Sequence, residues 1–240
     1  MPDPKQSANS LQPADPDEAR GVAVTREEIA VFTDPRGQIA EQFRGLRNSI
    51  HALNPDGASH TLVVTSALPK EGKTVATLNL AISLAELSGV EVLIADADLH
   101  RPQLESYLGL RRRQGLTEVL TGRLDIDRAI RQTSVPGVSI LGAGELPGNP
   151  SELLAADRMR SLLNRLRQRF SYVILDTPEA MTISDASLLG AMADGVLLVV
   201  KLGSTPRHFV EQTYNTLEAL GGNVLGTCLT GAHEVDTSKA

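Results

Sequence analysis

The sequence has few aromatic residues and almost no cysteine. Its 240 residues include no tryptophan, and aromatic side chains make up 3% of the chain. So few rings argue against a surface on which nucleic-acid bases stack. The one cysteine, Cys228, excludes an internal disulfide framework and a cysteine metal cluster, and it fits a reducing compartment.

Excess positive charge and long hydrophobic runs are also missing. The formal net charge of −6 disfavours non-specific binding to nucleic acid or anionic lipid. No segment approaches the ~20 apolar residues of a membrane span, and the first residues, MPDPKQSANS, lack the layout of a signal peptide. The 41% hydrophobic and 22% charged residues are typical of a globular protein. We therefore expect a cytosolic protein with no nucleic-acid partner.

Short apolar runs alternate with helical stretches through most of the chain. The runs are apolar throughout, which is typical of parallel strands buried on both faces. This layout predicts an α/β fold with a doubly wound, mostly parallel sheet and helices on both faces. The expected strands are Thr61–Ser66, Val90–Ala95, Val138–Leu141, Tyr172–Leu175, Val196–Lys201 and Val224–Leu229, and the expected helices are Thr74–Leu87, Pro150–Arg169, Ser184–Ala193 and Arg207–Leu220.

The two ends of the chain differ from this central region. Residues 1–20 hold four prolines and almost nothing bulky, so we expect residues 1–36 to be disordered or extended. One folded domain should cover residues 37–231 and begin with a helix over 37–52, in which apolar residues recur at helical spacing. That stripe consists of Ile39, Phe43, Leu46 and Ile50. Residues 232–240 are expected to form a short flexible tail.

A phosphate-binding loop is the clearest motif. Ser66 ends a predicted strand, and ALPKEGKT leads from it into a predicted helix. Gly72 allows backbone N–H groups to approach phosphate oxygens, Lys73 supplies a cation for the β- and γ-phosphates, and the Thr74 hydroxyl is a ligand suited to Mg²⁺. We expect the loop to bind ATP and Mg²⁺ through Ala67, Leu68, Pro69, Lys70, Glu71, Gly72, Lys73, Thr74 and Val75.

The loop departs from the strict pattern, which has glycine at the position of Ala67. A surface loop that happens to contain Gly-Lys-Thr is therefore the alternative interpretation. Two features favour the phosphate loop: the motif follows a strand, and the helix that it opens is apolar on nearly all sides, as a buried helix should be.

Three aspartates follow two other predicted strands. Asp96 and Asp98 come after one strand and Asp176 after another, and ligands of doubly wound sheets bind at these carboxyl ends. Any one of them could be a turn or helix-cap residue. Together with the phosphate loop, they predict a site with Lys73, Asp96, Asp98 and Asp176 as catalytic residues and Thr74, Asp96, Asp98 and Asp176 around Mg²⁺.

These motifs resemble those of a known family. SALPKEGKT, VLIADADLHRPQL, YVILDTPE and the upstream IAEQFRGLRNSI are similar to segments of the bacterial tyrosine kinases (BY-kinases) of capsule and exopolysaccharide export, and the resemblance covers about residues 37–231. It implies an ATP·Mg²⁺-dependent protein-tyrosine kinase of the P-loop class. By the same resemblance, Lys73 and Thr74 bind ATP·Mg²⁺, Asp96 and Asp98 are a metal ligand and the catalytic base, and Asp176 completes the metal shell.

The resemblance also implies partners. A membrane polysaccharide co-polymerase of the chain-length-determinant type would activate the protein at the inner face of the plasma membrane. Glu41, Arg44 and Arg47 match the family's oligomerisation pattern and would form subunit contacts in a ring. Their spacing alone indicates a polar helix face, turned away from the apolar stripe, with an ordinary salt bridge.

Several positions depart from the family pattern. Relatives usually end in a tyrosine-rich tail, whereas this chain ends in GAHEVDTSKA, so we expect it to phosphorylate a partner rather than itself. Thr230 stands where relatives carry an asparagine near the adenine, and Glu179 replaces a second proline after Asp-Thr-Pro. His100 could be an exposed loop residue or a phosphate contact.

Two other functions remain open. One is a nucleotide-gated oligomeric switch that controls polysaccharide assembly without phosphorylating tyrosine, which the tyrosine-free tail favours. The other is a partition-type ATPase. Leu68 disfavours it, because those ATPases carry a signature lysine at that position.

Overall fold

The computed structural model describes residues 27–155 and 157–231. The expectations for residues 1–26 and 232–240 lie outside them. Seven strands form one sheet in the order β3-β4-β2-β5-β1-β6-β7. The strands are β1 (His60–Ser66), β2 (Val92–Asp96), β3 (Arg131–Gln132), β4 (Val138–Leu141), β5 (Tyr172–Asp176), β6 (Gly195–Lys201) and β7 (Val224–Thr230).

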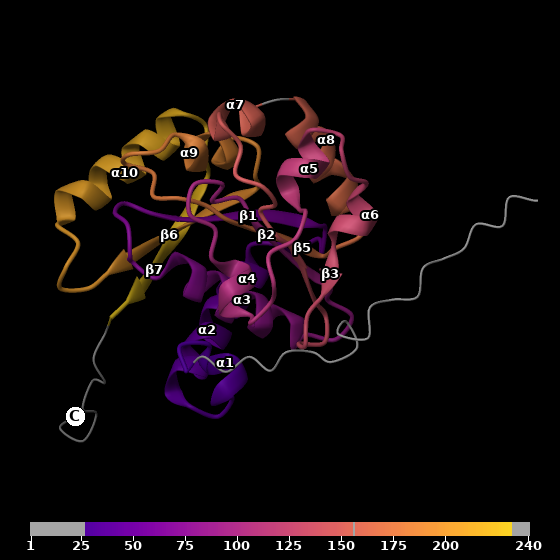
Figure 1. The fold of residues 1–240 in the computed structure, drawn as a ribbon. Helices are drawn as coiled ribbons and strands as arrows, with labels where there is room; N and C mark the ends of the chain where they lie inside the picture. The colour runs from indigo at the N-terminus through magenta and orange to yellow at the C-terminus, as the bar shows by residue number, and fades with distance from the viewer. Residues whose placement is uncertain (1–26, 156, 232–240) are drawn as a thin grey trace, which may run out of the picture.

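Helices cover both faces of this sheet (Figure 1). In the view of Figure 1, α1, α2 and α3 lie below the sheet, and α7, α8, α9 and α10 lie above it. The helices are α1 (Ala30–Thr33), α2 (Gln38–Ala52), α3 (Lys73–Ala85), α4 (Leu104–Tyr107), α5 (Leu116–Leu120), α6 (Ile126–Ala129), α7 (Pro150–Ala155), α8 (Asp157–Arg167), α9 (Asp185–Gly190) and α10 (Arg207–Ala219). The predicted doubly wound α/β fold is confirmed.

The strands are apolar on both sides because each side packs into a separate core. Leu62 and Val64 of β1 face the core between the sheet and α3, while Val63 between them faces the core that α8 and α9 cover. Within the described residues all strand pairs are parallel except β3 with β4. Both faces are shielded from water, so the continuous apolar runs are the expected pattern.

Some elements were missed or misjudged from the sequence. β3 has only two residues and α4, α5 and α6 have four or five, too few for a periodic pattern. Residues 150–169, expected as one helix, contain α7 and α8 on either side of residue 156, which lies outside the described residues.

The expected start of the folded domain at residue 37 is wrong. Ile29 and Val31 are buried, and α1 packs against α3. Asn79 of α3 joins the two segments: its side chain accepts a hydrogen bond from Val31 N at 3.0 Å and donates one to Glu28 O at 2.9 Å. A segment this short gives no periodicity, so only its contacts with α3 show that it is ordered.

Among the described residues, no helix combines the length and the apolar character needed to cross a membrane.

Candidate functional site

The phosphate loop joins the end of β1 to the start of α3. Its backbone turns through the left-handed region at Lys70 (φ 63°) and Gly72 (φ 93°). Gly72 is the residue immediately before the first turn of α3. This places the unpaired N–H groups of a 13-residue helix at the loop, and such groups attract anions.

Glu71 fixes the shape of the loop from within. The residue is 3% exposed, and its carboxylate accepts hydrogen bonds from Leu68 N at 3.2 Å and from the Thr205 hydroxyl. The Thr230 hydroxyl donates to Glu71 O at 2.7 Å. Thr230, expected near the adenine, therefore uses its hydroxyl to brace the phosphate loop.

Asp96 and Asp176 end adjacent parallel strands at the same level. They are register partners of β2 and β5, and they are 0% and 2% exposed. Asp176 accepts hydrogen bonds from the hydroxyls of Thr74 at 2.7 Å and Thr77 at 3.3 Å. Asp96 Oδ2 accepts from Leu104 N at 3.0 Å, whereas Oδ1 has no hydrogen-bond partner within the described residues.

Burial makes it costly for this pair to carry two charges. It raises the pKa of Asp176 to about 7, although the Thr74 hydroxyl and the Lys73 ammonium oppose the rise. Burial and the neighbouring Asp176 raise the pKa of Asp96 well above its usual range. A cation between the two carboxylates would reverse both effects.

The residues at this position fit Mg²⁺. The orphaned Asp96 Oδ1, the Asp176 carboxylate and the Thr74 hydroxyl are hard oxygen donors. Within the described part of the chain, no group of three His, Cys, Asp or Glu side chains could hold a metal ion by itself. Mg²⁺ usually takes one or two carboxylates and completes its shell with phosphate oxygens and water, so a small protein donor set is what it requires.

Asp98 lies on the loop that follows β2 and points differently from Asp96. Its Oδ1 accepts hydrogen bonds from His100 N at 3.2 Å and Arg101 N at 2.8 Å, and the residue is partly exposed. The loop is anchored by His100, whose Nε2 lies 3.0 Å from the buried Asp185 Oδ2, and Ser151 donates to the other oxygen of Asp185. His100 is thus a partner of a carboxylate and not a free loop residue.

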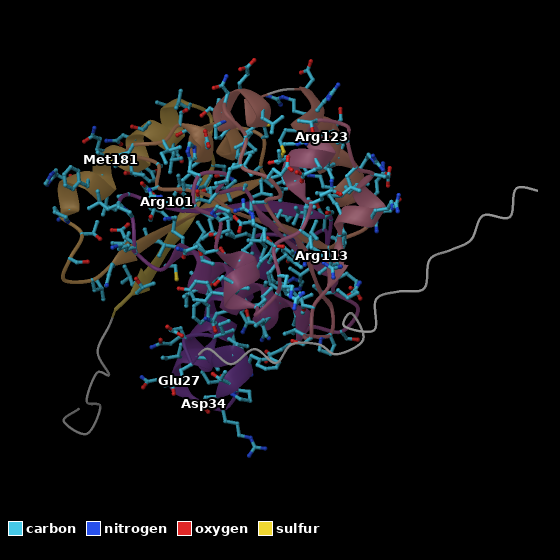
Figure 2. All side chains as sticks on the ribbon, viewed as in Figure 1. Glu27, Asp34, Arg101, Arg113, Arg123 and Met181 are labelled. Carbon is cyan, nitrogen blue, oxygen red and sulfur yellow. The ribbon has the colours of Figure 1, made fainter. Side chains whose placement is uncertain are left out.

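Glu179 was missed as a site residue by the sequence reasoning. It is 4% exposed, and its carboxylate lies 4.0 Å from Lys73 Nζ and 2.9 Å from a guanidinium nitrogen of Arg101. The Thr182 hydroxyl donates to it at 3.1 Å. Arg101, labelled in Figure 2, lies far from Glu27 and Asp34 at the lower end of the view, so this group is remote from α1. The sequence pointed to Glu179 only by having it in place of the second proline that relatives carry after Asp-Thr-Pro.

The arginines of α2 do not form a solvated polar face. Arg44 contacts Glu41 at 2.5 Å and Glu86, just beyond α3, at 2.6 Å, and Arg47 contacts Glu86 at 3.0 Å. The predicted apolar stripe is also wrong at Ile39, which is 54% exposed, because Ala40 takes its place in the core. Both arginines thus lie between α2 and α3. The apolar stripe of α2 predicted instead that they would face away from the rest of the domain.

The chain is similar to known kinases over most of its length. A family model described as an AAA domain matches residues 70–224. The tyrosine-protein kinase YwqD of Bacillus subtilis strain 168 is 32% identical over 88% of this chain and 89% of that protein. The tyrosine-protein kinase etk of Escherichia coli K12 is 34% identical over 82% of this chain, but the match spans only 27% of that longer protein.

Solved structures give the same grouping. The kinase domain of E. coli ETK superimposes with a TM-score of 0.82 at 32% identity, over 87% of this chain and 82% of that one. The septum site-determining protein MinD of Pyrococcus horikoshii, complexed with Mg-ADP, has a TM-score of 0.62 at 24% identity over 73% of this chain and 72% of that one. The second likeness is one of fold alone.

Proposed function

The chain belongs to the bacterial tyrosine kinases (BY-kinases) of capsule and exopolysaccharide synthesis, and we propose that it transfers the γ-phosphoryl group of ATP to tyrosines of a partner protein. The observation that carries this proposal is the buried Asp96–Asp176 pair beside the Thr74 hydroxyl, at the end of a phosphate loop. Lys73, at the N-terminus of α3, supplies the cation for the β- and γ-phosphates.

Each residue of the site has a distinct task in this proposal. The backbone from Ala67 to Val75 surrounds the phosphates, and Thr74, Asp96 and Asp176 hold Mg²⁺. When bound, Mg²⁺ supplies positive charge that stabilises the phosphates during transfer. Asp98 accepts the phenolic proton while the tyrosine oxygen bonds to the γ-phosphorus and the bond to ADP breaks. The N–H groups of His100 and Arg101 donate to Asp98 Oδ1 and fix the orientation of its carboxylate, which supports this role.

The partners follow from the family. We propose that a membrane polysaccharide co-polymerase of the chain-length-determinant type recruits and activates the protein at the inner face of the plasma membrane. We further propose a homo-oligomeric ring in which the α2 face with Glu41, Arg44 and Arg47 contacts a neighbour. Arg44 and Arg47 already contact Glu86 within the subunit, so this contact would add to an existing ion-pair network.

The nucleotide site is tested with Lys73→Ala and Thr74→Ala, and Lys201→Ala, which removes an exposed lysine at the end of β6, serves as the matched control. We expect the two loop variants to bind ATP·Mg²⁺ about 10- to 100-fold more weakly by isothermal titration, because each loses a charged or metal-linked contact. The control should bind like the wild type. Unchanged affinity in both loop variants would contradict the site.

The reaction is tested separately from binding. The full chain is incubated with ATP·Mg²⁺ and its membrane partner, and phosphotyrosine on the partner is followed by mass spectrometry. Nucleotide binding and ATP-dependent assembly without any phosphotyrosine would favour the nucleotide-gated switch instead.

A further inference from the structure

Glu179 is a buried carboxylate that the proposed reaction does not use. It lies between Lys73 of the phosphate loop and Arg101 of the Asp98 loop, at 4.0 Å and 2.9 Å. Its side chain is 6% exposed, the side chain of Lys73 is 10% exposed, and the side chain of Arg101 is 60% exposed. One negative charge is therefore shared between a nearly buried cation and a cation at the surface.

The backbone on either side of Glu179 is held at the end of β1, where the phosphate loop begins. Ala180 N donates to Ser66 O at 2.8 Å, and the Thr65 hydroxyl donates to Pro178 O at 2.8 Å. Both contacts tie the segment after β5 to the end of β1. Because the residues on either side of Glu179 are fixed, only rotation of its side chain can move the carboxylate away from Lys73.

The position of Glu179 relates it to the terminal phosphate. Lysine in this motif binds the β- and γ-phosphates, so bound nucleotide competes with Glu179 for Lys73. Arg101 is on the same loop as Asp98, which is proposed to face the acceptor. Glu179 thus lies between the cation that binds the β- and γ-phosphates and the loop that carries Asp98.

We infer that Glu179 is a specificity-determining residue that neutralises Lys73 and Arg101 before nucleotide binds and then opposes the γ-phosphate. This inference rests on the proposed nucleotide site. When ATP binds, Lys73 exchanges the carboxylate for phosphate oxygens, while Glu179 keeps Arg101 and the Thr182 hydroxyl. The fixed negative charge weakens the binding of ATP more than that of ADP, because only ATP has the γ-phosphate. A purely structural ion pair would have no such preference.

The test is the affinity of the full chain for ATP·Mg²⁺ and ADP·Mg²⁺ after Glu179→Gln. Glutamine can keep contacts with Arg101 and Thr182 but removes the charge. We expect the dissociation constant for ATP·Mg²⁺ to fall about fivefold, the effect of one unit charge at about 4 Å in a medium as polar as water. The fall for ADP·Mg²⁺ should be smaller, and added salt should reduce both changes. Glu211→Gln is the control, since Glu211 pairs with Arg207 on the exposed surface of α10.

Three outcomes decide the inference. A change of equal size for both nucleotides, no change, or weaker ATP binding in a folded Glu179→Gln protein would overturn it. If that variant does not fold, Glu179→Asp serves instead, because the shorter side chain withdraws the charge from Lys73 and should shift the ATP-to-ADP ratio in the same direction. Lys73→Ala distinguishes failure of the proposed nucleotide site from failure of the role of Glu179. Unchanged nucleotide binding by Lys73→Ala would contradict the site itself. Weaker binding by Lys73→Ala, together with no effect of Glu179→Gln, would refute only the role of Glu179.

Discussion

The buried carboxylates of Asp96 and Asp176 lower the stability of the folded protein when both are charged. Both carboxylates are buried, side by side, and Asp96 Oδ1 lacks a hydrogen-bond partner among the described residues. Burying two like charges costs free energy of folding unless a proton or a cation compensates. The proposed Mg²⁺ would supply that compensation, so the cost would fall on the metal-free protein.

The direction of the pH dependence follows from the raised pKa values. Between the usual aspartate pKa of about 4 and the pKa of about 7 for Asp176 in the folded protein, folding takes up protons. The stabilising contribution of the protonated pair is therefore complete below about pH 4 and is lost as the pH rises through about 7. We expect this loss in metal-free protein, because a bound cation would favour the ionised carboxylates.

Asp96→Asn should separate stability from activity. We expect the metal-free variant to gain about 2 kcal/mol of unfolding free energy near pH 8 and less near pH 5, because the amide carries no charge and can donate to Asp176. Its kinase turnover should fall about 100-fold or more. Thermal unfolding in a chelator at both pH values, with a kinase assay in Mg²⁺, provides the measurement. A loss of stability near pH 8 would contradict the account of the buried pair.

At the scale of elements, α2 is attached to the domain by charges as well as by apolar contacts. Ala40 and Ile50 pack into the core, while Arg44 and Arg47 converge on Glu86 just beyond the C-terminus of α3. The hydrogen bond from Arg44 lowers the pKa of Glu86, so this carboxylate contributes stability above its usual pKa and loses that contribution as the pH falls. Because Arg44 and Arg47 already pair with Glu86 within the subunit, replacing them would affect folding as well as any subunit contact.

Glu86→Gln should weaken the contact between α2 and α3 without changing the arginines. We expect it to lower the unfolding free energy by ~1 kcal/mol, because a partly buried carboxylate with two arginine partners is worth more than an exposed pair. Glu41→Gln is the control, since the Glu41 side chain is 66% exposed and should have little effect. Denaturant unfolding measures the difference, and an equal effect of both variants would contradict it.

Comparing Glu86→Gln with replacement of both arginines distinguishes the attachment of α2 to the domain from the assembly of subunits. If Arg44 and Arg47 contact a neighbouring subunit, Glu86→Gln should leave the oligomer intact in light scattering, whereas replacing both arginines should dissolve it. If the wild-type protein stays monomeric at all concentrations, with ATP and partner present, the proposed ring is contradicted.

At the scale of the whole molecule, the positions of the tyrosines determine whether the protein can phosphorylate itself. Tyr172 is 2% exposed in β5, and Tyr107 is partly buried in α4. Tyr214 is 44% exposed, but it lies within the 13-residue helix α10. A tyrosine in a rigid element reaches a neighbour's active site only by local unfolding, which lowers the population of the reactive state.

We therefore expect the 240-residue chain to phosphorylate itself weakly or not at all. Incubation with ATP·Mg²⁺ should give detectable ATP hydrolysis but little phosphotyrosine, and transfer should appear on tyrosines of an added partner. Mass spectrometry of Tyr107, Tyr172 and Tyr214 is the measurement. Stoichiometric phosphotyrosine on this chain, with no partner present, would refute the expectation.

The sequence by itself determined the fold class, the family and the phosphate loop. These depend on signals that are local in the chain: apolar runs of strand length, the Gly72-Lys73-Thr74 motif, and the aspartates that directly follow strands. Parallel strands end at one edge of a sheet, so the local pattern was sufficient to bring Asp96 and Asp176 together.

Only the tertiary structure decided the contacts between distant elements. Glu179 lies beside Lys73, which is 106 positions earlier in the chain, and Glu86 receives Arg44 and Arg47 from another helix. Ile29 is buried although its segment has no periodicity. Side-chain pairing across elements depends on packing and on rotamers, and neither leaves a repeating trace in the sequence.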